Sequence, residues 1–409
     1  MPASSTQLPP AGYKLAEVGE IPDDWGSVPL AELGKMFSGG TPRLSEARFW
    51  DGEIPWVSSK DMKVARLHDA IDHVTPAAIG NGTRLVKPGT LLMVVRGMSL
   101  VHTFAVAIVE TPLAFNQDLK AFLPHADGNS EFLLRWLEAN QSRVLQLATE
   151  STHGTKRIPT GDLLASHVPL PPPAERRAIA EALSDVDGLL GALDALIAKK
   201  RAIKQAAMQQ LLTGKTRLPS FSGSWETKRL GDVCALKSGC GITSARIDWS
   251  STYPCFGGNG LRGFTTTFTH EGSYALIGRQ GALCGNVVSA TGKFFASEHA
   301  LVVTARSGFD IDWLTHLLKD MRLNQYSESS AQPGLSAAKL LMLEVSSPPS
   351  RQEQSAIATV LSDIDAETAA LERRRNKTRA IKQGMMQQLL TGRVRLVQPT
   401  MSTPEVATP

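Results

Sequence analysis

The stretch Arg-Ala-Ile-Lys-Gln-Ala-Ala-Met-Gln-Gln-Leu-Leu-Thr-Gly at residues 201–214 returns at residues 379–392 with two substitutions. Around it, residues 175–218 align without a gap with residues 353–396, and each position is displaced by 178. Dissimilar sequence separates the two copies. A repeat of this length indicates two equivalent structural units in one chain.

Both copies have the apolar spacing of long helices. In the first copy, apolar residues alternate by four and three, which predicts a narrow seam for pairing with another helix. Thr368 and Arg375 interrupt the seam of the second copy, and Gly214 and Gly392 are the expected C-terminal stops. Each helix would span ~60 Å. We expect the two to pair antiparallel as a spacer through Ile179, Leu183, Val186, Leu190, Leu193, Ile197, Ile357, Leu361, Ile364 and Leu371.

The blocks before each helix also resemble one another. A Trp-x4-Leu-x2-apolar-x4-Ser-Gly pattern begins at Trp25 and again at Trp225, and we expect both tryptophans to be core anchors. Short helices are predicted around residues 131–147 and 311–323. We therefore expect an α+β chain with two pseudo-symmetric globular domains joined by two long antiparallel helices. The predicted boundaries are 1–173 (with 1–20 flexible), 174–214 (first helix), 215–349, 350–392 (second helix) and 393–409 (flexible tail).

The composition is that of an ordinary soluble globular protein. The chain has 409 residues, 42% hydrophobic and 20% charged, with a net charge of +4 that permits nucleic-acid binding without demanding it. No apolar run is long enough to span a membrane, and residues 1–10 lack the apolar core of a signal peptide. Four cysteines without a CxxC pair make neither a disulfide nor a zinc site necessary. We expect a cytoplasmic protein without a metal.

Catalytic motifs are missing from the sequence. Gly214-Lys215-Thr216 resembles the end of a phosphate-binding loop, but position 209 is Gln where the motif needs Gly, and the preceding segment is helical. No Asn-Pro-Pro-aromatic tetrapeptide and no Gly-x-Ser-x-Gly elbow is present. We expect no catalytic residue in this chain.

Basic residues within the blocks are the remaining candidates for function. Taken singly, each is expected to be a solvated surface charge. As a set in two duplicated, loop-rich blocks, they suit phosphate contact and readout of bases in the major groove. The predicted DNA-binding residues are Lys60, Lys63, Arg66, Arg96, Lys120, Lys156, Arg157, Lys237, Arg246, Arg262, Arg279, Lys293 and His299.

Several motifs together resemble the specificity subunits of type I restriction–modification enzymes. They are the proline-rich entry to each helix, Ala-Ile-Ala-x2-Leu-Ser-Asp-x-Asp as read at residues 178–187 and 356–365, and Arg-Ala-Ile-Lys-Gln-x2-Met-Gln-Gln-Leu-Leu-Thr-Gly. Residues 49–56, Phe-Trp-Asp-Gly-Glu-Ile-Pro-Trp, look like the opening of a target-recognition domain in that family. The resemblance covers residues 25–396.

The resemblance implies a division of labour. Each block would be a target-recognition domain that reads one half of a split double-stranded DNA site. The helices would fix the distance between half-sites and dock two modification subunits, which carry S-adenosylmethionine and methylate adenine. Restriction subunits using ATP and Mg would join the complex, and neither cofactor would bind this non-catalytic chain. Two alternatives stay open: a related enzyme whose modification and cleavage activities share one partner chain, and a coiled-coil scaffold that does not read DNA.

Overall fold

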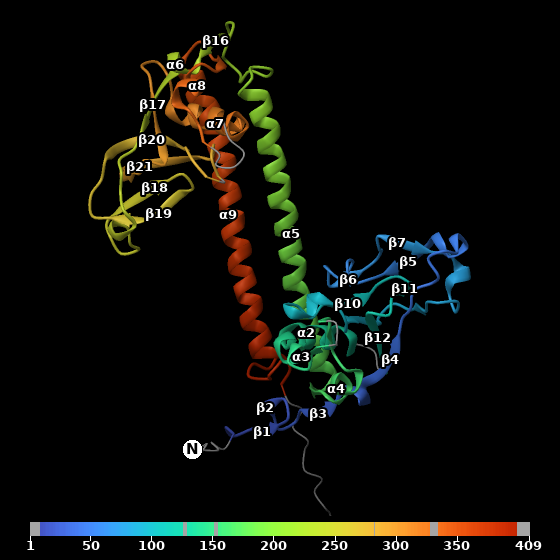
Figure 1. Cartoon of the computed structure of the whole chain (residues 1–409). Coiled ribbons are helices and arrows are strands. Elements are labelled where there is room, and N and C mark those ends of the chain that lie inside the picture. Colours follow the sequence, from blue (N-terminus) through green and yellow to red (C-terminus); the bar gives the residue numbers. More distant parts are fainter. Residues whose placement is uncertain (1–8, 126–128, 151–153, 282, 328–333, 399–409) are drawn as a thin grey trace, which may run out of the picture. The chain divides into compact units, whose positions relative to one another are not determined.

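A computed structural model describes residues 9–125, 129–150, 154–281, 283–327 and 334–398 (Figure 1). The chain divides into two compact units: unit 1 comprises residues 1–191 and 376–409, and unit 2 comprises residues 192–375. Both boundaries fall inside the long helices α5 (Pro173–Leu211) and α9 (Arg351–Leu389), so each helix contributes to both units. The predicted helices are confirmed to within three residues at each end.

Unit 1 is built on two small sheets. The order is β4-β12-β9-β10-β6 in one and β7-β5-β11-β8 in the other. Helix α2 packs on the first sheet against β10 and β12. The main strands are β4 (Gly34–Ser38), β5 (Trp50–Val57), β6 (Arg66–Leu67), β7 (Asp72–Val74), β8 (Leu85–Val86), β9 (Leu91–Val94), β10 (Val106–Val109), β11 (Leu113–Phe115) and β12 (Leu119–Pro124). The helices are α1 (Leu30–Leu33), α2 (Asn129–Ala139), α3 (Gln141–Leu145) and α4 (Thr160–Ala165), with 3-10 turns η1 (Ala47–Phe49), η2 (Pro76–Ala78) and η3 (Met98–Val101).

Short strand pairs complete unit 1. The antiparallel pairs are β1 (Tyr13–Ala16) with β2 (Gly19–Pro22), β3 (Gly26–Pro29) with β15 (His167–Leu170), and β13 (Thr149–Glu150) with β14 (Lys156–Arg157). Because β1 and β2 are paired strands, the expectation that residues 1–20 are all flexible is wrong for residues 13–20.

Unit 2 repeats the plan with one larger sheet of order β17-β22-β20-β21-β18-β19. Its first four strands correspond to β4, β12, β9 and β10, and α7 takes the place of α2 by packing on β20 and β21. The strands are β17 (Cys234–Ser238), β18 (Tyr253–Gly257), β19 (Gly260–Thr265), β20 (His270–Gly278), β21 (Val287–Ala296) and β22 (Ala300–Ala305), with β16 (Glu226–Arg229) paired to β23 (Glu344–Ser347). The helices are α6 (Leu230–Val233), α7 (Ile311–Asp320) and α8 (Ala337–Leu341), with η4 (Ser244–Arg246) and η5 (Leu323–Tyr326).

The long helices close the core of each unit. Ile179 and Leu183 near the start of α5 are fully buried and join Leu389 and Leu390 in the core of unit 1. In unit 2, the repeat equivalents Ile357 and Leu361 join Met208, Leu211 and Leu212 in the core. Each core therefore receives the start of one helix and the end of the other. Six of the ten predicted seam residues are buried, namely Ile179, Leu183, Leu193, Ile197, Ile357 and Leu361, whereas Val186, Leu190, Ile364 and Leu371 are half-buried. Ile179, Leu183, Ile357 and Leu361 pack into the domain cores.

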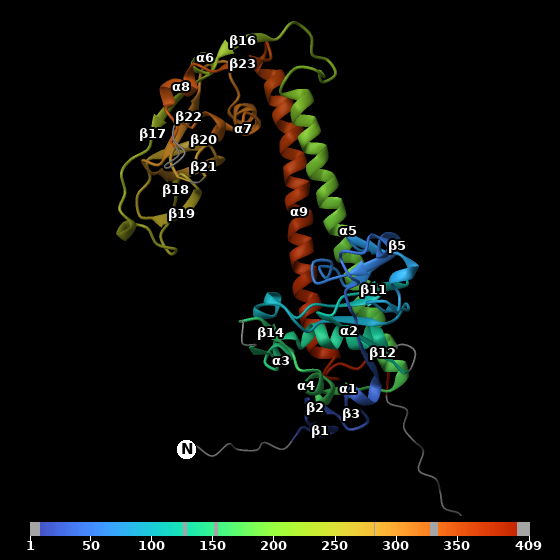
Figure 2. The same ribbon diagram turned by 45° about the vertical axis from the view of Figure 1, so that its right-hand side comes forward.

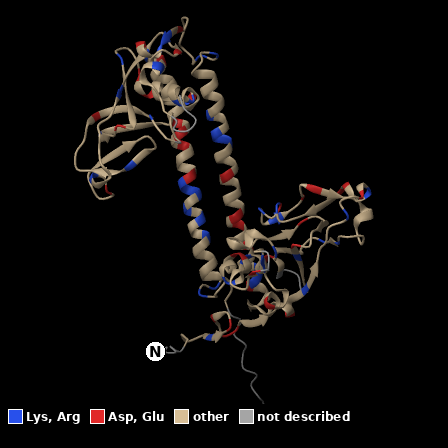
Figure 3. Ribbon diagram, viewed as in Figure 1, with Lys and Arg blue, Asp and Glu red and all other residues tan. Residues whose placement is uncertain are grey.

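Ion pairs show that α5 and α9 run antiparallel within each unit (Figure 2). In unit 1, Lys382 pairs with Asp187 at 2.7 Å. In unit 2, Lys204 pairs with Asp365 at 2.6 Å, and these two residues are the equivalents of Lys382 and Asp187 after the 178-residue shift. Along the middle of each long helix, Figure 3 shows an acidic stretch followed toward the C-terminus by a basic stretch. The same ion pair between the long helices therefore occurs in each unit.

The two polar seam positions are accommodated locally. The Thr368 hydroxyl donates to the Ile364 carbonyl at 2.7 Å, which satisfies the group inside its own helix. Arg375 reaches across to Asp194 at 3.3 Å. Thr368 and Arg375 therefore interrupt the apolar seam without leaving a polar group unsatisfied at these two bonds.

A Trp–Glu–Arg cluster marks the same place in each unit. In unit 1, Trp25 is fully buried and donates to Glu175 at 3.0 Å, while Arg395 binds the same carboxylate at 2.6 Å. In unit 2, Arg217 holds Glu353, and Trp225 donates to it at 3.4 Å. Arg395 lies in the segment predicted to be a flexible tail, so that prediction is wrong for residues 393–398. Residues 399–409 lie outside the described part of the chain.

Candidate DNA interface

Unit 1 gathers three predicted basic residues at one end of its first sheet. Arg96 follows β9, Lys120 lies on β12, and an isolated bridge joins Arg96 to Arg157 on β14. The pKa of Lys120 is lowered by burial and then by the charges of Arg157 and Arg96. Like charges held this close favour an anion, and DNA phosphates are the anions that Lys and Arg contact most often in protein–DNA complexes.

A glycine lets the chain that leaves β4 pass close to another part of the backbone beside this cluster. Gly39 follows β4, and a Cβ at this position would lie 2.3 Å from the carbonyl oxygens of Phe115 and Asn116. Only glycine allows this approach. Ser38 Oγ then accepts a hydrogen bond from Lys120 Nζ at 2.5 Å. The Ser-Gly pair thus fixes where the lysine is presented.

Unit 2 holds the same arrangement with different basic residues. A Cβ at Gly239 would lie 2.3 Å from the carbonyl oxygen of Ala296, and Ser238 Oγ accepts a hydrogen bond from Arg279 at 2.8 Å. Lys237 precedes this serine on β17. The pKa of His270 is lowered mainly by burial and to a lesser degree by the charge of Lys237. The predicted equivalence of residues 38–39 and 238–239 is confirmed, since in both units the serine binds a basic side chain.

Most of the other predicted residues of unit 1 form ion pairs with acidic side chains of the same unit. Lys60 pairs with Asp72 at 2.7 Å and Lys156 pairs with Glu150 at 3.0 Å. Arg66 binds Glu131 at 2.7 Å and also Glu110. Lys63 is exposed beside them. Internal ion pairs leave little net charge for DNA at Lys60, Arg66 and Lys156, and their predicted contact with DNA stays a prediction.

In unit 2, three predicted residues are exposed without an ion pair among the described residues: Lys237 on β17, Arg246 at the end of η4 and Arg262 on β19. Lys293 lies over the Phe268 ring at 4.9 Å, and His299 Nδ1 meets Gln280 Oε1 at 3.1 Å. Their contact with DNA also stays a prediction.

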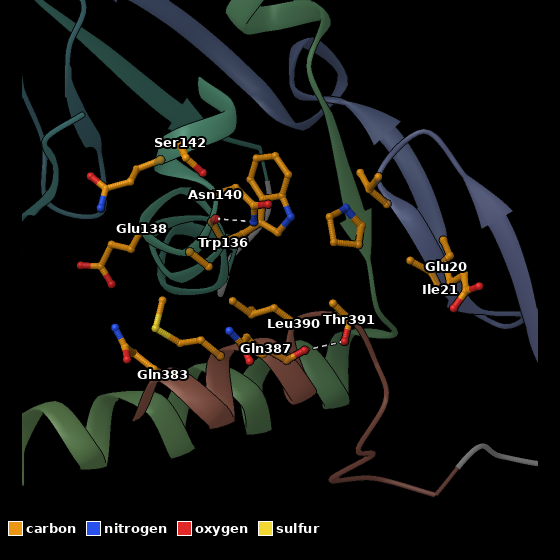
Figure 4. A pocket seen from close by; sticks show the side chains of 15 residues that line it. Glu20, Ile21, Trp136, Glu138, Asn140, Ser142, Gln383, Gln387, Leu390 and Thr391 are labelled. Carbon is orange, nitrogen blue, oxygen red and sulfur yellow. Dashed lines mark hydrogen bonds between the residues drawn. The ribbon is translucent and has the colours of Figure 1, made fainter. Parts of the chain in front are cut away.

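Unit 1 also has a cleft that sequence reasoning did not find (Figure 4). It has a volume of about 560 Å³ and lies between α2–α3, strand β2 and the end of α9. From α9, Gln383 and Gln387 line it, and both are exposed. Their repeat equivalents Gln205 and Gln209 are identical and exposed too. This internal identity at exposed positions was the signal available in the sequence.

The described residues contain no group of three or more His, Cys, Asp or Glu side chains placed to hold a metal ion. Within the same ranges, no helix has the length and apolar character to cross a membrane. The four cysteines are free thiols, of which only Cys240 is exposed.

Comparison with known proteins identifies the family. The family model described as the type I restriction modification DNA specificity domain matches residues 22–201 and again residues 223–379. The EcoprrI specificity subunit of Escherichia coli is 30% identical over 383 residues, covering 88% of this chain and 91% of its own. The MjaIX specificity subunit of Methanocaldococcus jannaschii is 24% identical over 257 residues, covering 58% of this chain and 57% of its own.

Solved structures share the fold. The S subunit of a type I restriction-modification system from M. genitalium superposes with a TM-score of 0.67 at 16% identity, covering 94% of this chain and 99% of that one. A second chain, from a structure of type I R-M complex assembly, gives a TM-score of 0.52 at 16% identity, covering 91% and 99%. The chain belongs to the type I restriction–modification DNA specificity family and is a specificity subunit with two target-recognition domains.

Proposed function

We propose that each unit reads one half of a bipartite DNA site. The observation that carries this proposal is the recurrence of one arrangement, a basic side chain held by the serine of a Ser-Gly pair at the end of a strand, at Ser38 in unit 1 and Ser238 in unit 2. The basic residue that the serine holds differs between units, Lys120 in one and Arg279 in the other, so the two half-sites are expected to differ in sequence. Two readers in one chain gain affinity because the second binds at high effective concentration.

The paired helices act as the ruler between half-sites in this proposal. Continuous helices of 39 residues each, paired by repeated ion pairs, support a fixed register. Removing one heptad from α5 and the facing heptad from α9 shortens the pair by ~10 Å. The gap should then shrink by about three base pairs, since each base pair of DNA rises 3.4 Å. The deletion belongs in the middle of the helices, because Leu183 and Leu361 are core residues.

Two modification subunits are the proposed partners, and restriction subunits join them. Support comes from exposed residues that are identical in both copies of the repeat, since matched surfaces suit two identical partners. These residues are Lys199 and Lys377, Arg201 and Arg379, Gln205 and Gln383, Gln209 and Gln387, and Gln210 and Gln388. S-adenosylmethionine, ATP and Mg bind the partners in this proposal. The chain itself has no catalytic role and works with them in the cytoplasm.

The partner surface can be tested in one unit at a time. Replacing Gln383 and Gln387 with Ala should remove one modification subunit and leave one, because Gln205 and Gln209 remain. Native mass spectrometry of the co-expressed complex measures the ratio. Retention of both partners would exclude the cleft as a docking surface.

The function itself is tested by mapping adenine methylation across the genome of cells with the modification subunit, with and without this chain. The expected result is a bipartite motif with a fixed gap that appears only with the chain. The absence of any chain-dependent motif would refute the proposal that the two units read DNA.

A further inference from the structure

Unit 2 displays a tryptophan that the fold does not need to expose. Trp249 is 74% exposed, although a large aromatic side chain gains roughly 2 kcal/mol or more from burial. It lies in the segment between η4 and β18, and its ring contact among the described residues is with Phe264, at 6.3 Å between centroids. An exposed indole offers a large apolar surface to a binding partner.

Hydrogen bonds hold the backbone of the loop around Trp249. Asp248 and Phe264 exchange two backbone hydrogen bonds, of 2.9 and 2.6 Å, which tie the loop to β19. The Asp248 carboxylate accepts from the backbone N–H groups of Ser250 and Ser251, both at 2.6 Å, and from both serine hydroxyls. These bonds lower the pKa of Asp248 to about 2, so they persist at neutral pH. The backbone that carries the exposed indole is therefore tied down on both sides of Trp249.

The corresponding segment of unit 1 does not expose its aromatic residues. There, η1 leads into β5 with Phe49 buried at 4% exposure, and Trp50 packs edge-on against Trp56 at 5.2 Å. The same connection can therefore bury its aromatic side chains. The exposure of Trp249 is a property of unit 2 and not a requirement of the fold.

The surroundings of Trp249 indicate a nucleic-acid ligand. Arg246 stands three residues earlier, and Arg262 lies on the strand to which the loop is tied; both are exposed, and neither has an ion pair among the described residues. Leu261, 46% exposed, adds a second apolar side chain. Apolar side chains flanked by unpaired arginines match DNA, where phosphates accept from arginine and bases offer an apolar face or a thymine methyl group.

We propose that Trp249 makes an apolar contact with a base of the half-site read by unit 2 and contributes to its specificity. This inference rests on the proposed function. Arg246 and Arg262 bind the flanking phosphates. Because the Asp248 hydrogen bonds already order the loop, little conformational entropy is lost when it binds DNA.

The test uses the full chain in complex with its modification subunits and a duplex carrying the methylated motif. Trp249→Ala should weaken binding to this duplex about 10-fold, as expected for loss of one aromatic–base contact. Trp249→Phe should lose less than about 3-fold, and binding to an unrelated duplex should stay within about 2-fold. Met342→Ala, which alters another exposed apolar residue of unit 2, is the matched control and should bind like wild type.

Acrylamide quenching separates DNA contact from protein contact. The difference between wild type and Trp249→Phe isolates the fluorescence of Trp249, which should be accessible in the complex and shielded once the specific duplex is added. Shielding upon assembly with the modification subunits, before DNA, would overturn the inference, as would equal affinity of wild type and Trp249→Ala. If the wild-type complex binds no bipartite duplex, the proposed function fails and the inference fails with it.

Discussion

In both units a short domain helix packs against the long helices, but the charged side chains at this contact differ. Where α2 crosses the long helices in unit 1, buried Arg135 binds Asp187 at 2.5 Å, Glu138 at 3.1 Å and Ser184 at 3.2 Å. In unit 2, His316 of α7 takes the place of Arg135 and meets Ser362, the repeat equivalent of Ser184, at 3.1 Å. The long helices keep Asp, Lys and Ser in both units, while the domain helix supplies the variation.

The difference leaves unit 2 with an excess of positive charge. Lys319 stands three residues after His316, as Glu138 stands three residues after Arg135. Burial and then Lys204 lower the pKa of Lys319, whereas Glu138 lies 3.8 Å from Lys382. The positive and negative charges of the unit 1 network therefore balance, whereas positive charges outnumber negative ones in the unit 2 network. The repeat fixes the partners offered by the spacer, and each domain adapts to them.

The largest expected effect is the loss of Arg135. Arg135→Met leaves Asp187 and Glu138 with Lys382 alone, and should destabilise unit 1 by about 3 kcal/mol, because breaking a buried ion pair strands its partners. The matched change His316→Met removes one neutral hydrogen bond and should cost unit 2 only about 1 kcal/mol. Hydrogen exchange followed by mass spectrometry reports each unit separately. Equal losses in the two units would contradict the comparison.

Acid should weaken unit 2 through His316. Burial, with Lys319 and Lys204, lowers the pKa of His316 to about 4, against 6.5 for an ordinary histidine. The unfolded chain therefore binds a proton before the folded one, and stability falls as the pH drops from about 6.5 to 4. The expected loss is on the order of 2 kcal/mol. Hydrogen exchange of α7 at several pH values measures it, and His316→Gln should remove this part of the pH dependence.

The helix ends differ in a smaller way. Gly392 and Gly214 both have positive φ, +68° and +72°. A Cβ at Gly392 would lie 2.4 Å from Pro22, while one at Gly214 would lie 2.9 Å from the Trp225 ring. Gly392→Ala should cost about 2 kcal/mol and Gly214→Ala about 1 kcal/mol. Thermal unfolding of the two variants compares them, and a larger loss for Gly214→Ala would reverse the expected order.

The smallest effect should be a gain. Lys319→Glu gives unit 2 the acidic residue that unit 1 has at Glu138, close to Lys204 and His316. We expect stabilisation of about 0.5 kcal/mol and an upward shift of the His316 pKa. Proton NMR titration of the His316 ring follows the shift. An unchanged or lower pKa would show that charge at position 319 does not act on His316.

Much of this architecture could be predicted from the repeat. The 178-residue displacement predicted the two long helices, and the seam residues Ile179, Leu183, Ile357 and Leu361 are fully buried. The sequence did not predict that the helix ends complete the domain cores, because seam periodicity alone does not distinguish a helix partner from a sheet. The Trp–Glu–Arg cluster was missed because Arg395 and Glu175 lie 220 residues apart.

The sequence predicted the kind of residue in the candidate site, but not which basic residues are exposed and which are held in ion pairs. Gly39 and Gly239 carried a signal, since the same dipeptide recurs at the same place in both blocks. Composition could not separate Arg66, which is held by two carboxylates, from exposed Arg262. The difference depends on which acidic residues the fold brings near, and such contacts are long-range.

Binding to a duplex with one half-site scrambled tests the central claim most directly, that each unit reads its own half-site. The wild-type complex should lose affinity when either half is scrambled. A chain with Ala at Arg96, Lys120 and Arg157 should become insensitive to scrambling of one half and remain sensitive to the other, while Ala at Lys237 and Arg279 should give the reverse pattern. If either variant stays sensitive to both halves, or loses sensitivity to both, the two units do not read DNA independently.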